Sequence, residues 1–283
     1  TSAGPALRIN LNVEATVTIH LTGTNSLITK DNWYAGLQKD NEAQLIIKTN
    51  NSDATAGILN ARSIDGDGAG IGGGYYGIGS CSNITINSGS VTASSTDGAG
   101  IGGGLYGDGS DIIINNSSVT ASSTNGAGIG GGEGNSCSRI TINSSSVTAS
   151  STDGAGIGGG GYGASSVSGI TINSSSVTAS STNGAGIGGG KGGAGSNNIT
   201  INGGSVKASS VSGSPTNKGK EVYCCTIENP ENANVTIKPG TGSSEWNWKP
   251  VNHSSLDPDD TNLYVWLPKL ESNSTNSYLI ILD

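Results

Sequence analysis

The chain has 283 residues, with 48 Gly, no Phe and no Met, and with 21 acidic against 13 basic residues. A composition this poor in large apolar side chains excludes a broad core of aromatic rings and leaves a narrow core of Ala, Val and Ile. The net charge of −8, without a run of Lys or Arg, argues against a nucleic-acid partner. No apolar stretch reaches the ~20 residues of a membrane-spanning helix, so we expect no membrane insertion.

The N-terminal segment, residues 1–16, contains one short alternating stretch. Leu7-Arg8-Ile9-Asn10-Leu11 alternates apolar and polar residues with a period of two. This period predicts a strand, and we expect it to cap the open end of the following fold. The first five residues carry no charged or apolar signal-peptide region, so we expect that any signal peptide has been removed or was never part of this sequence.

Residues 17–240 are organised as internal repeats. The segment Gly-Ala-Gly-Ile-Gly-Gly-Gly occurs five times, starting at residues 68, 98, 126, 154 and 184. The starts lie 30, 28, 28 and 30 residues apart, and each copy precedes a variable tip, an Ile-x-Ile segment and a Ser-Val-x-Ala-Ser segment. A fixed period of this length indicates that each repeat is one rung of a stack.

The alternation of side chains predicts which residues of a rung form the core. In one repeat the inward set is Ile84, Ile86, Val91, Ala93, Ala99 and Ile101. The same alternation places Gly98, Gly100 and Gly102 on an outer face that has no side chains. The residue before each Gly-Ala-Gly is one that tolerates the left-handed region and forms a corner of the coil: Asp67, Asp97, Asn125, Asp153 or Asn183.

Two degenerate cycles precede the regular repeats. Their matches to the Ile-x-Ile strand are Val17-Thr18-Ile19 and Leu45-Ile46-Ile47, and their match to the Ser-Val-Thr strand is Ser26-Leu27-Ile28. Their matches to Ala-Gly-Ile are Ala35-Gly36-Leu37 and Ala56-Gly57-Ile58. Three strands and about 28 residues per turn predict an all-β, single-stranded parallel β-helix of about seven to eight rungs. The handedness of parallel crossovers favours a right-handed coil.

The regular pattern fades after residue 210, and residues 241–283 are expected to form a C-terminal β cap. We expect residues 221–227 to replace a glycine strand and residues 234–237 to form a last Ile-Thr-Ile strand. Leu263–Leu267 and Tyr278–Leu282 predict a hairpin in a region that holds Trp246, Trp248 and Trp266. An uncovered end of the coil would present open sheet edges, which a cap removes.

Residues 17–240 resemble the glycine-rich parallel β-helix repeats of large bacterial surface proteins, mainly Gram-positive and gut-associated. Segments similar to ITINSGSVTASSTDGAGIGGG, residues 84–104 here, recur in those proteins, and NLYVWLP, residues 262–268, resembles segments that end such repeat regions. The resemblance implies a secreted or cell-surface protein with an adhesin-like or glycan-associated role. Its expected partners are glycans or host and cell-surface components, and it implies no catalytic residue.

An enzyme is an alternative, because many parallel β-helices are polysaccharide lyases or hydrolases. Their sites need clustered carboxylates, often with calcium, and a Lys or Arg base on one face. Here the charged residues of the repeats are isolated and lie in different columns: Asp108, Asp111, Arg139, Lys191 and Lys207. The two histidines, His20 and His253, lie in opposite terminal regions. We therefore expect no catalytic residues, no cofactor and no enzyme activity.

Two motifs invite a ligand assignment that their details do not support. Asp65-Gly66-Asp67-Gly68 resembles the start of a calcium loop, but Ala69 stands at the third acidic position and Tyr76 at that of the bidentate Glu. The glycine runs lack the Gly-Lys-[Ser/Thr] sequence and the strand-to-helix context of a phosphate loop. We expect glycine-rich turns and no metal site.

The four cysteines are expected to be free thiols. Cys81 and Cys137 have the same offset two repeats apart, which places them ~9.6 Å apart in register. A disulfide needs a Cα separation of about 4.4–6.8 Å. Cys224 and Cys225 are adjacent and should point to opposite faces.

The position two residues after each glycine run holds a tyrosine in three of five repeats. Tyr76, Tyr106 and Tyr162, with Tyr75 beside the first, could form an edge row on which sugar rings stack. The alternative, which we favour, is that these rings pack over the glycine face as anchors of the tips. The primary expectation is a non-catalytic extracellular or cell-surface adhesion module, with a carbohydrate-binding module as the alternative.

Outward columns of threonine suggest a third kind of surface. Flat threonine arrays suit ice or a crystalline polysaccharide, but Ile113 and Lys207 interrupt these columns. Solvated sheet faces are the simpler interpretation.

Overall fold

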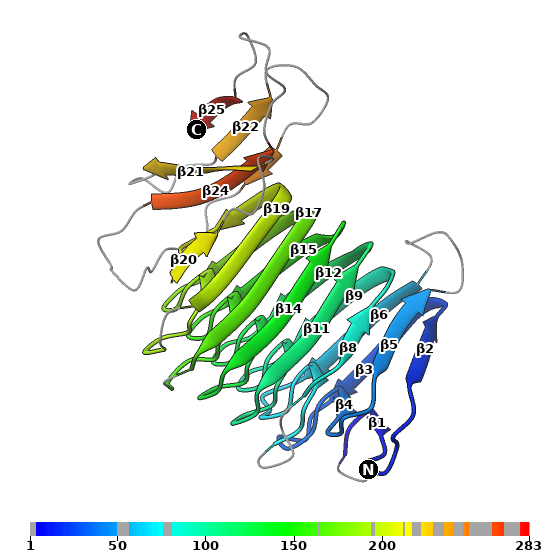
Figure 1. Cartoon of the computed structure of the whole chain (residues 1–283). Coiled ribbons are helices and arrows are strands. Elements are labelled where there is room, and N and C mark those ends of the chain that lie inside the picture. Colours follow the sequence, from blue (N-terminus) through cyan, green and yellow to red (C-terminus); the bar gives the residue numbers. More distant parts are fainter. Residues whose placement is uncertain are drawn as a thin grey trace.

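The computed structural model describes residues 4–49, 57–75, 81–163, 165–193, 196–211, 213–216, 222–228, 235–239, 246–248, 262–268 and 278–282. Within these ranges all regular structure is β, and successive strands coil into a stack of rungs (Figure 1). The predicted parallel β-helix is confirmed by three runs of parallel strands, which we call the glycine, isoleucine and valine sheets.

The glycine sheet contains the Ile-Gly pairs of the heptapeptides. Its seven strands mark about six turns of the coil, slightly fewer than the seven to eight expected. In order they are β1 (Leu7–Ile9), β4 (Leu37–Lys39), β7 (Ile71–Gly72), β10 (Ile101–Gly102), β13 (Ile129–Gly130), β16 (Ile157–Gly158) and β18 (Ile187–Gly188).

The isoleucine and valine sheets form the other two sides of each turn. The isoleucine sheet consists of β2 (Val17–Leu21), β5 (Leu45–Thr49), β8 (Ile84–Ile86), β11 (Gly109–Asn115), β14 (Cys137–Asn143) and the first part of β17 (Val167–Ser181). The valine sheet consists of β3 (Gly23–Thr29), β6 (Gly57–Ser63), β9 (Gly89–Ser94), β12 (Ser117–Ser122), β15 (Ser146–Ser151) and the second part of β17. β19 (Ser196–Ala208) continues both sheets by pairing with the whole of β17.

The inward columns follow the predicted alternation. Ile84, Ile112 and Ile140 pair in register, as do Val91, Val119 and Val147 and their equivalents in the later rungs. The six inward residues predicted for the first regular repeat are at most 1% exposed. Burial of these small branched side chains supplies the hydrophobic stabilisation of each rung.

The glycine face is closed, and the prediction that it lies bare on the outside is wrong. Gly98, Gly100 and Gly102 are buried. A Cβ on Gly100 would lie 2.6 Å from the carbonyl oxygen of Gly128 in the next rung, and one on Gly102 would overlap the carbonyl oxygen of Gly130. Glycine is required here because neighbouring backbones approach closer than any side chain allows.

Buried serines at the corners bind each rung to the one before it. Ser95 Oγ donates to the carbonyl oxygen of Gly68 at 2.6 Å, and Ser123 Oγ donates to that of Gly98 at 2.7 Å. Ser151 and Ser181 repeat the bond in the next two rungs. These hydroxyls satisfy carbonyl groups that would otherwise be buried without a partner.

The two degenerate early rungs are present, but one of their segments belongs to a different sheet from the one that the sequence predicts. Leu37 pairs with Ile71, as expected for a glycine strand, and Leu45 pairs with Ile84. The segment at residues 56–59 was expected to match Ala-Gly-Ile. Instead Leu59, in β6, pairs with Val91 and belongs to the valine sheet, because its inward leucine fills the valine column.

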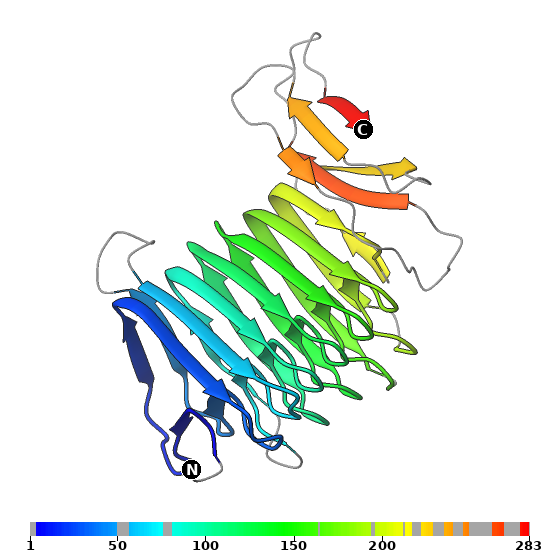
Figure 2. The same ribbon diagram turned by 180° about the vertical axis from the view of Figure 1, so that it is seen from behind.

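The C-terminal strands pair in a way that differs from the prediction (Figure 2). β24 (Asn262–Pro268) and β25 (Tyr278–Leu282) do not form a hairpin with each other. β24 runs antiparallel to both β19 and β21 (Val222–Glu228), whereas β25 pairs with β22 (Val235–Pro239). β22 also pairs with β23 (Trp246–Trp248) and is not a last Ile-Thr-Ile rung. β21 likewise joins β24 and does not replace a glycine strand.

β24 covers the last complete rung, and a short parallel strand flanks it there. Val265 of β24 pairs with Lys207 of β19, whose side chain is 2% exposed. Burial lowers the pKa of Lys207 to about 8. β20 (Gly213–Thr216) adds to the isoleucine part of β19 in parallel. A solvated threonine column therefore does not continue to this end of the coil.

We predict that Gly102→Ala will destabilise the coil by about 3–5 kcal/mol, because the new methyl group meets the backbone of the next rung. Urea unfolding of the purified chain measures the loss. The control is Gly192→Ala, since Gly192 also has a positive φ of 76° but no atom within 4 Å of the added Cβ. The control should lose only about 1–2 kcal/mol. Equal losses in the two variants would contradict the close-contact explanation.

Candidate functional site

The candidate site is an edge of the coil that we call the tip edge. It consists of the corner residues before each Gly-Ala-Gly and the first two residues after each glycine run. Each tip binds the corner of the preceding rung through its backbone: Glu133 N donates to Asp97 O at 2.9 Å, and Lys191 N donates to Asp153 O at 2.7 Å. Equivalent bonds join Leu105 to Asp67 and Gly161 to Asn125. The tips are thereby stacked in register.

The corner residues do not adopt the left-handed conformation expected from their Asp and Asn identities, since none of the five has a positive φ. Their role is to bond along the stack instead. Asn125 Nδ2 donates to Asp97 Oδ1 at 2.5 Å, and Asn183 Nδ2 donates to Asp153 Oδ1 at 2.6 Å. On the tip edge it is the tyrosines that adopt this conformation, Tyr106 with a φ of 58° and Tyr162 with a φ of 61°.

Three of the four predicted tyrosines lie among the described residues, and all three are on the tip edge; Tyr76 lies outside the described residues. Tyr106 and Tyr162 are 52% and 56% exposed. The ring of Tyr106 lies over the next rung, since a Cβ on Gly134 would be 3.2 Å from its Cδ1. This contact fits an anchor over a glycine, whereas the exposed ring surface also fits a stacking ligand.

A tryptophan that sequence reasoning did not include extends the aromatic row. Tyr75 N donates to Trp33 O at 2.9 Å, so Trp33 occupies the corner position of an early rung. The two rings lie 5.9 Å apart at 38°, and Trp33 is 63% exposed. The signal that could have found it is the position of Trp33 two residues before Ala35-Gly36-Leu37, where later rungs have Asp or Asn.

The ring of Tyr162 contacts a cation from the chain itself, the ammonium group of Lys191. Tyr162 Oη donates to Asp153 Oδ2 at 2.8 Å, and Lys191 Nζ lies 4.8 Å from the centre of the Tyr162 ring. The same ammonium lies 3.4 Å from Asp153 Oδ1. The pKa of Asp153 falls despite the opposing effect of its burial, because Tyr162, Asn183 and Lys191 stabilise the carboxylate.

Nearer the N-terminus the tip edge accumulates negative charge. Burial and the neighbouring carboxylate of Asp97 raise the pKa of Asp67 to about 6. Burial also raises the pKa of Glu133, and the carboxylates of Asp97, Asp153 and Asp67 add to that effect. Every charged group that acts on Glu133 in this way is thus another carboxylate.

A ladder of asparagine amides was missed in the sequence. The Asn that follows each Ile-x-Ile donates from Nδ2 to Oδ1 of the Asn one rung earlier, at 2.6–2.8 Å. The ladder comprises Asn87, Asn115, Asn143, Asn173 and Asn202. Its recurrence at one position of every repeat was the available signal.

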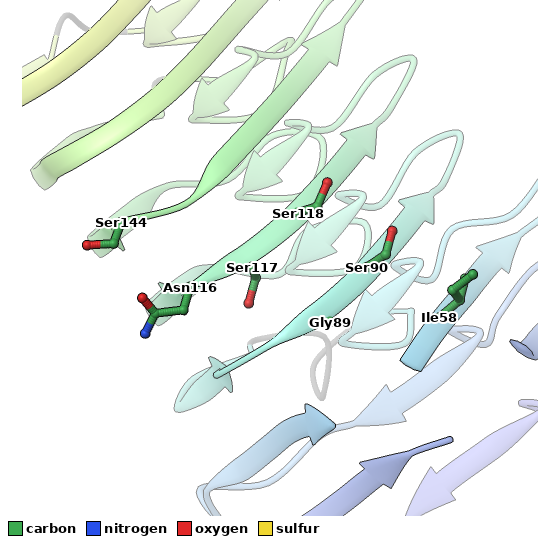
Figure 3. A pocket seen from close by; sticks show the side chains of 7 residues that line it. All are labelled: Ile58, Gly89, Ser90, Asn116, Ser117, Ser118 and Ser144. Atoms are coloured by element: carbon green, nitrogen blue, oxygen red, sulfur yellow. The ribbon is translucent and has the colours of Figure 1, made fainter. Parts of the chain in front are cut away.

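An open groove of about 540 Å³ lies along the valine sheet (Figure 3). Its lining consists of Ile58, Gly89, Ser90, Asn116, Ser117, Ser118 and Ser144. Asn116 and Ser144 stand at left-handed turns with φ of 47° and 46°. The serine hydroxyls and the Asn116 amide can form hydrogen bonds, but the lining has no charged group and no aromatic face, so the groove is a weaker candidate than the tip edge.

The residues weighed for catalysis do not converge. Arg139 Nη2 donates to Asp111 Oδ2 at 2.6 Å on an exposed face, and Asp108 Oδ1 accepts from Ser136 N at 3.0 Å. Among the described residues, no three His, Cys, Asp or Glu side chains are placed to hold a metal ion. His253 lies outside the described residues. No helix in the described part of the chain is long and apolar enough to cross a membrane.

The two cysteines of the repeats are buried free thiols, as predicted. Cys81 pairs with Gly109 and Gly109 with Cys137, so the thiols are two rungs apart in one column. Burial raises the pKa of Cys81 to about 12 and that of Cys137 further, which leaves both unreactive. The side chains of Cys224 and Cys225 are outside the described part of the structure.

Comparison with protein families supports the repeat architecture alone. The family described as "Beta helix repeat" matches residues 84–105, 112–133, 140–161, 170–191 and 199–214. These segments are the regular rungs and make up less than half of the chain, so the match identifies a β-helix repeat region within it. Searches of curated proteins and of solved structures give no significant match.

We predict that Asp67→Asn will stabilise the protein at neutral pH. The folded state raises the pKa of Asp67 from 3.8 to about 6, so it binds this proton more tightly than the unfolded state does. The stability contributed by the proton is present at low pH and is lost as pH rises through about 4–6. An asparagine side chain, such as that of Asn125, does not titrate, so the variant does not lose stability in this pH range. We expect Tm to rise by about 1–3 °C at neutral pH and the pH dependence in this window to weaken.

Asp153→Asn is the matched control, since the folded state lowers the pKa of Asp153. Its carboxylate contributes stability at neutral pH that is lost in acid, so this variant should lower Tm. A rise in Tm for Asp153→Asn, or none for Asp67→Asn, would contradict the assignment of charge repulsion to the Asp67 end of the tip edge.

Proposed function

We propose that the chain is a non-catalytic extracellular surface or adhesion module built on a rigid repeat scaffold. The observation that carries this proposal is the asparagine ladder, in which four inter-rung amide bonds of 2.6–2.8 Å run from Asn87 to Asn202. The recurrent asparagines and corner serines of the repeats thus form hydrogen bonds between rungs. A stack bonded in this way through backbone and side chains serves as a stiff spacer that presents its tips.

The surface location is supported by the resemblance to repeats of bacterial surface proteins, and it is tested directly on cells that produce the protein. An antibody raised against the purified chain should label intact cells or appear in the medium. Labelling that requires permeabilised cells, with no protein in the medium, would overturn the proposal. An antibody against a cytosolic protein of the same cells is the control for intactness.

A carbohydrate-binding module is the second candidate, and the exposed aromatic row favours it. Trp33, Tyr106 and Tyr162 are each more than half exposed on one edge. Flat aromatic faces beside carboxylate and amide groups are what sugar rings require, since the rings stack while their hydroxyls form hydrogen bonds.

We predict that a glycan array will show binding by the purified chain and that Tyr106→Ala will weaken it at least about tenfold, which corresponds to ~1.4 kcal/mol. Thr120→Ala is the control, because Thr120 is exposed on the valine sheet away from the tips. An array without signal, or a signal that Tyr106→Ala leaves unchanged, removes this candidate.

A polysaccharide lyase or hydrolase is the least favoured alternative. Arg139, a candidate base, forms an ion pair with Asp111 on an exposed face, which favours a role in joining rungs. Absence of activity on uronate polymers in calcium buffer would agree with a non-catalytic module, and product formation would overturn it.

A further inference from the structure

Two tips of the tip edge have the same backbone hydrogen bonds but differ in one charged residue. The Tyr162 module consists of Asp153, Tyr162, Asn183 and Lys191. Asp153 is the corner, Asn183 donates to it from the next rung, and Lys191 N donates to its carbonyl oxygen. Tyr162 N in turn donates to Lys191 O at 2.9 Å. The lysine is thereby held above the tyrosine ring, with its ammonium 3.4 Å from Asp153.

The Tyr106 module has the same backbone connections. It consists of Asp97, Tyr106, Asn125 and Glu133. Asn125 donates to Asp97, Glu133 N donates to Asp97 O, and Tyr106 N donates to Glu133 O at 3.1 Å. Glu133 therefore stands where Lys191 stands two rungs later.

The exchange of Lys for Glu changes the charge of the module. The Tyr162 module balances the carboxylate of Asp153 with the ammonium of Lys191, and its lower corner neighbour is the neutral Asn125. The Tyr106 module has Glu133 and Asp97, and its lower corner neighbour is Asp67. Besides burial, the carboxylate of Asp97 raises the pKa of both Asp67 and Glu133, and that of Asp67 adds to the effect on Glu133. Lys191 thus supplies a cation to the Tyr162 module, whereas the Tyr106 module has a carboxylate at the same place.

We propose that the Tyr106 module binds the protonated amine of an amino sugar within an oligosaccharide, in the position that Lys191 occupies in the Tyr162 module. The sugar ring lies on the exposed face of Tyr106 and its ammonium pairs with Asp97 and Glu133. The proposal rests on the carbohydrate-binding candidate above and names its ligand class.

An oligosaccharide fits the tip edge better than a metal ion or a lone amine. Tyr106 and Tyr162 are two rungs apart, which corresponds to ~10 Å at the spacing of paired strands. That distance is comparable with the length of a disaccharide, so alternate rings of a β-1,4-linked chain meet the two tyrosines. The described side chains of this region form no three-ligand metal group.

The test compares two hexasaccharides of equal length, β-1,4-linked glucosamine and its fully N-acetylated form, by calorimetry at a pH at which the amine is protonated. The glucosamine form should bind at least about tenfold more tightly, and added salt should reduce the difference. Glu133→Lys copies the Tyr162 module and should abolish the preference while the circular dichroism and Tm remain those of a folded chain. Lys191→Glu should strengthen binding of the glucosamine form.

The outcomes distinguish failure of this inference from failure of the carbohydrate-binding candidate on which it rests. If both hexasaccharides bind equally, or if Glu133→Lys leaves the preference unchanged, the inference is wrong. Carbohydrate binding then still stands when Tyr106→Ala removes the binding. If neither hexasaccharide binds, the inference falls, and a glycan array without signal removes the carbohydrate-binding candidate as well. Tighter binding of a lysine-rich peptide than of the glucosamine form would assign the module to a protein partner and overturn the inference.

Discussion

The close approach of glycine backbones in successive rungs is the constraint on which the rest of the structure depends. Each Ile-Gly strand pairs with the next at a distance that leaves no room for a Cβ on Gly100 or Gly102. This contact fixes the register of the rungs, and the register aligns the serine bonds, the asparagine ladder and the tips. The tip edge exists as an ordered row because the strands beneath it cannot shift.

Much of the fold was readable from the sequence because period and alternation are local properties. The inward columns, such as Ile84 with Ile112, and the two-rung separation of Cys81 and Cys137 follow directly from repeat spacing. The sheet that contains residues 56–59 was not readable in this way, because Ala56-Gly57-Ile58 satisfies the Ala-Gly-Ile pattern while Leu59 fills the valine column. Only the pairing of β6 with β9 distinguishes these alternatives.

The rest depended on information that alternation does not contain. The sequence pattern of a glycine that points outward is the same whether its face contacts solvent or another backbone. The burial of Gly98 was therefore not predictable. The partners of β24 and β25 depend on contacts between segments far apart in the chain. At the tip edge the sequence indicated Tyr106 and Tyr162, whereas Trp33 and the contrast between Glu133 and Lys191 emerged only once backbone bonds had aligned the tips.

The scaffold and the tips therefore follow different rules. Positions that face the core or a neighbouring backbone accept few residue types, as the recurring Ala, Ile and Gly of the heptapeptides show. The tips accept Tyr or Gly at one position and Tyr, Leu, Glu, Gly or Lys at the position before it. Charge and aromatic surface can thus change at one rung without disturbing the stack, which is the property that a recognition surface on a rigid support requires.

The uniform faces of the rungs also bear on how such a protein changes its length. Each regular rung presents the same Ile, Val, Ala and Gly columns to the rung before and after it, so removal or duplication of one complete repeat brings matching faces together. Recombination between near-identical repeats in the gene would yield chains that differ by one whole turn and still fold. Such an event would add or delete one tip from the row, so the number of tips and the reach of the module would vary together.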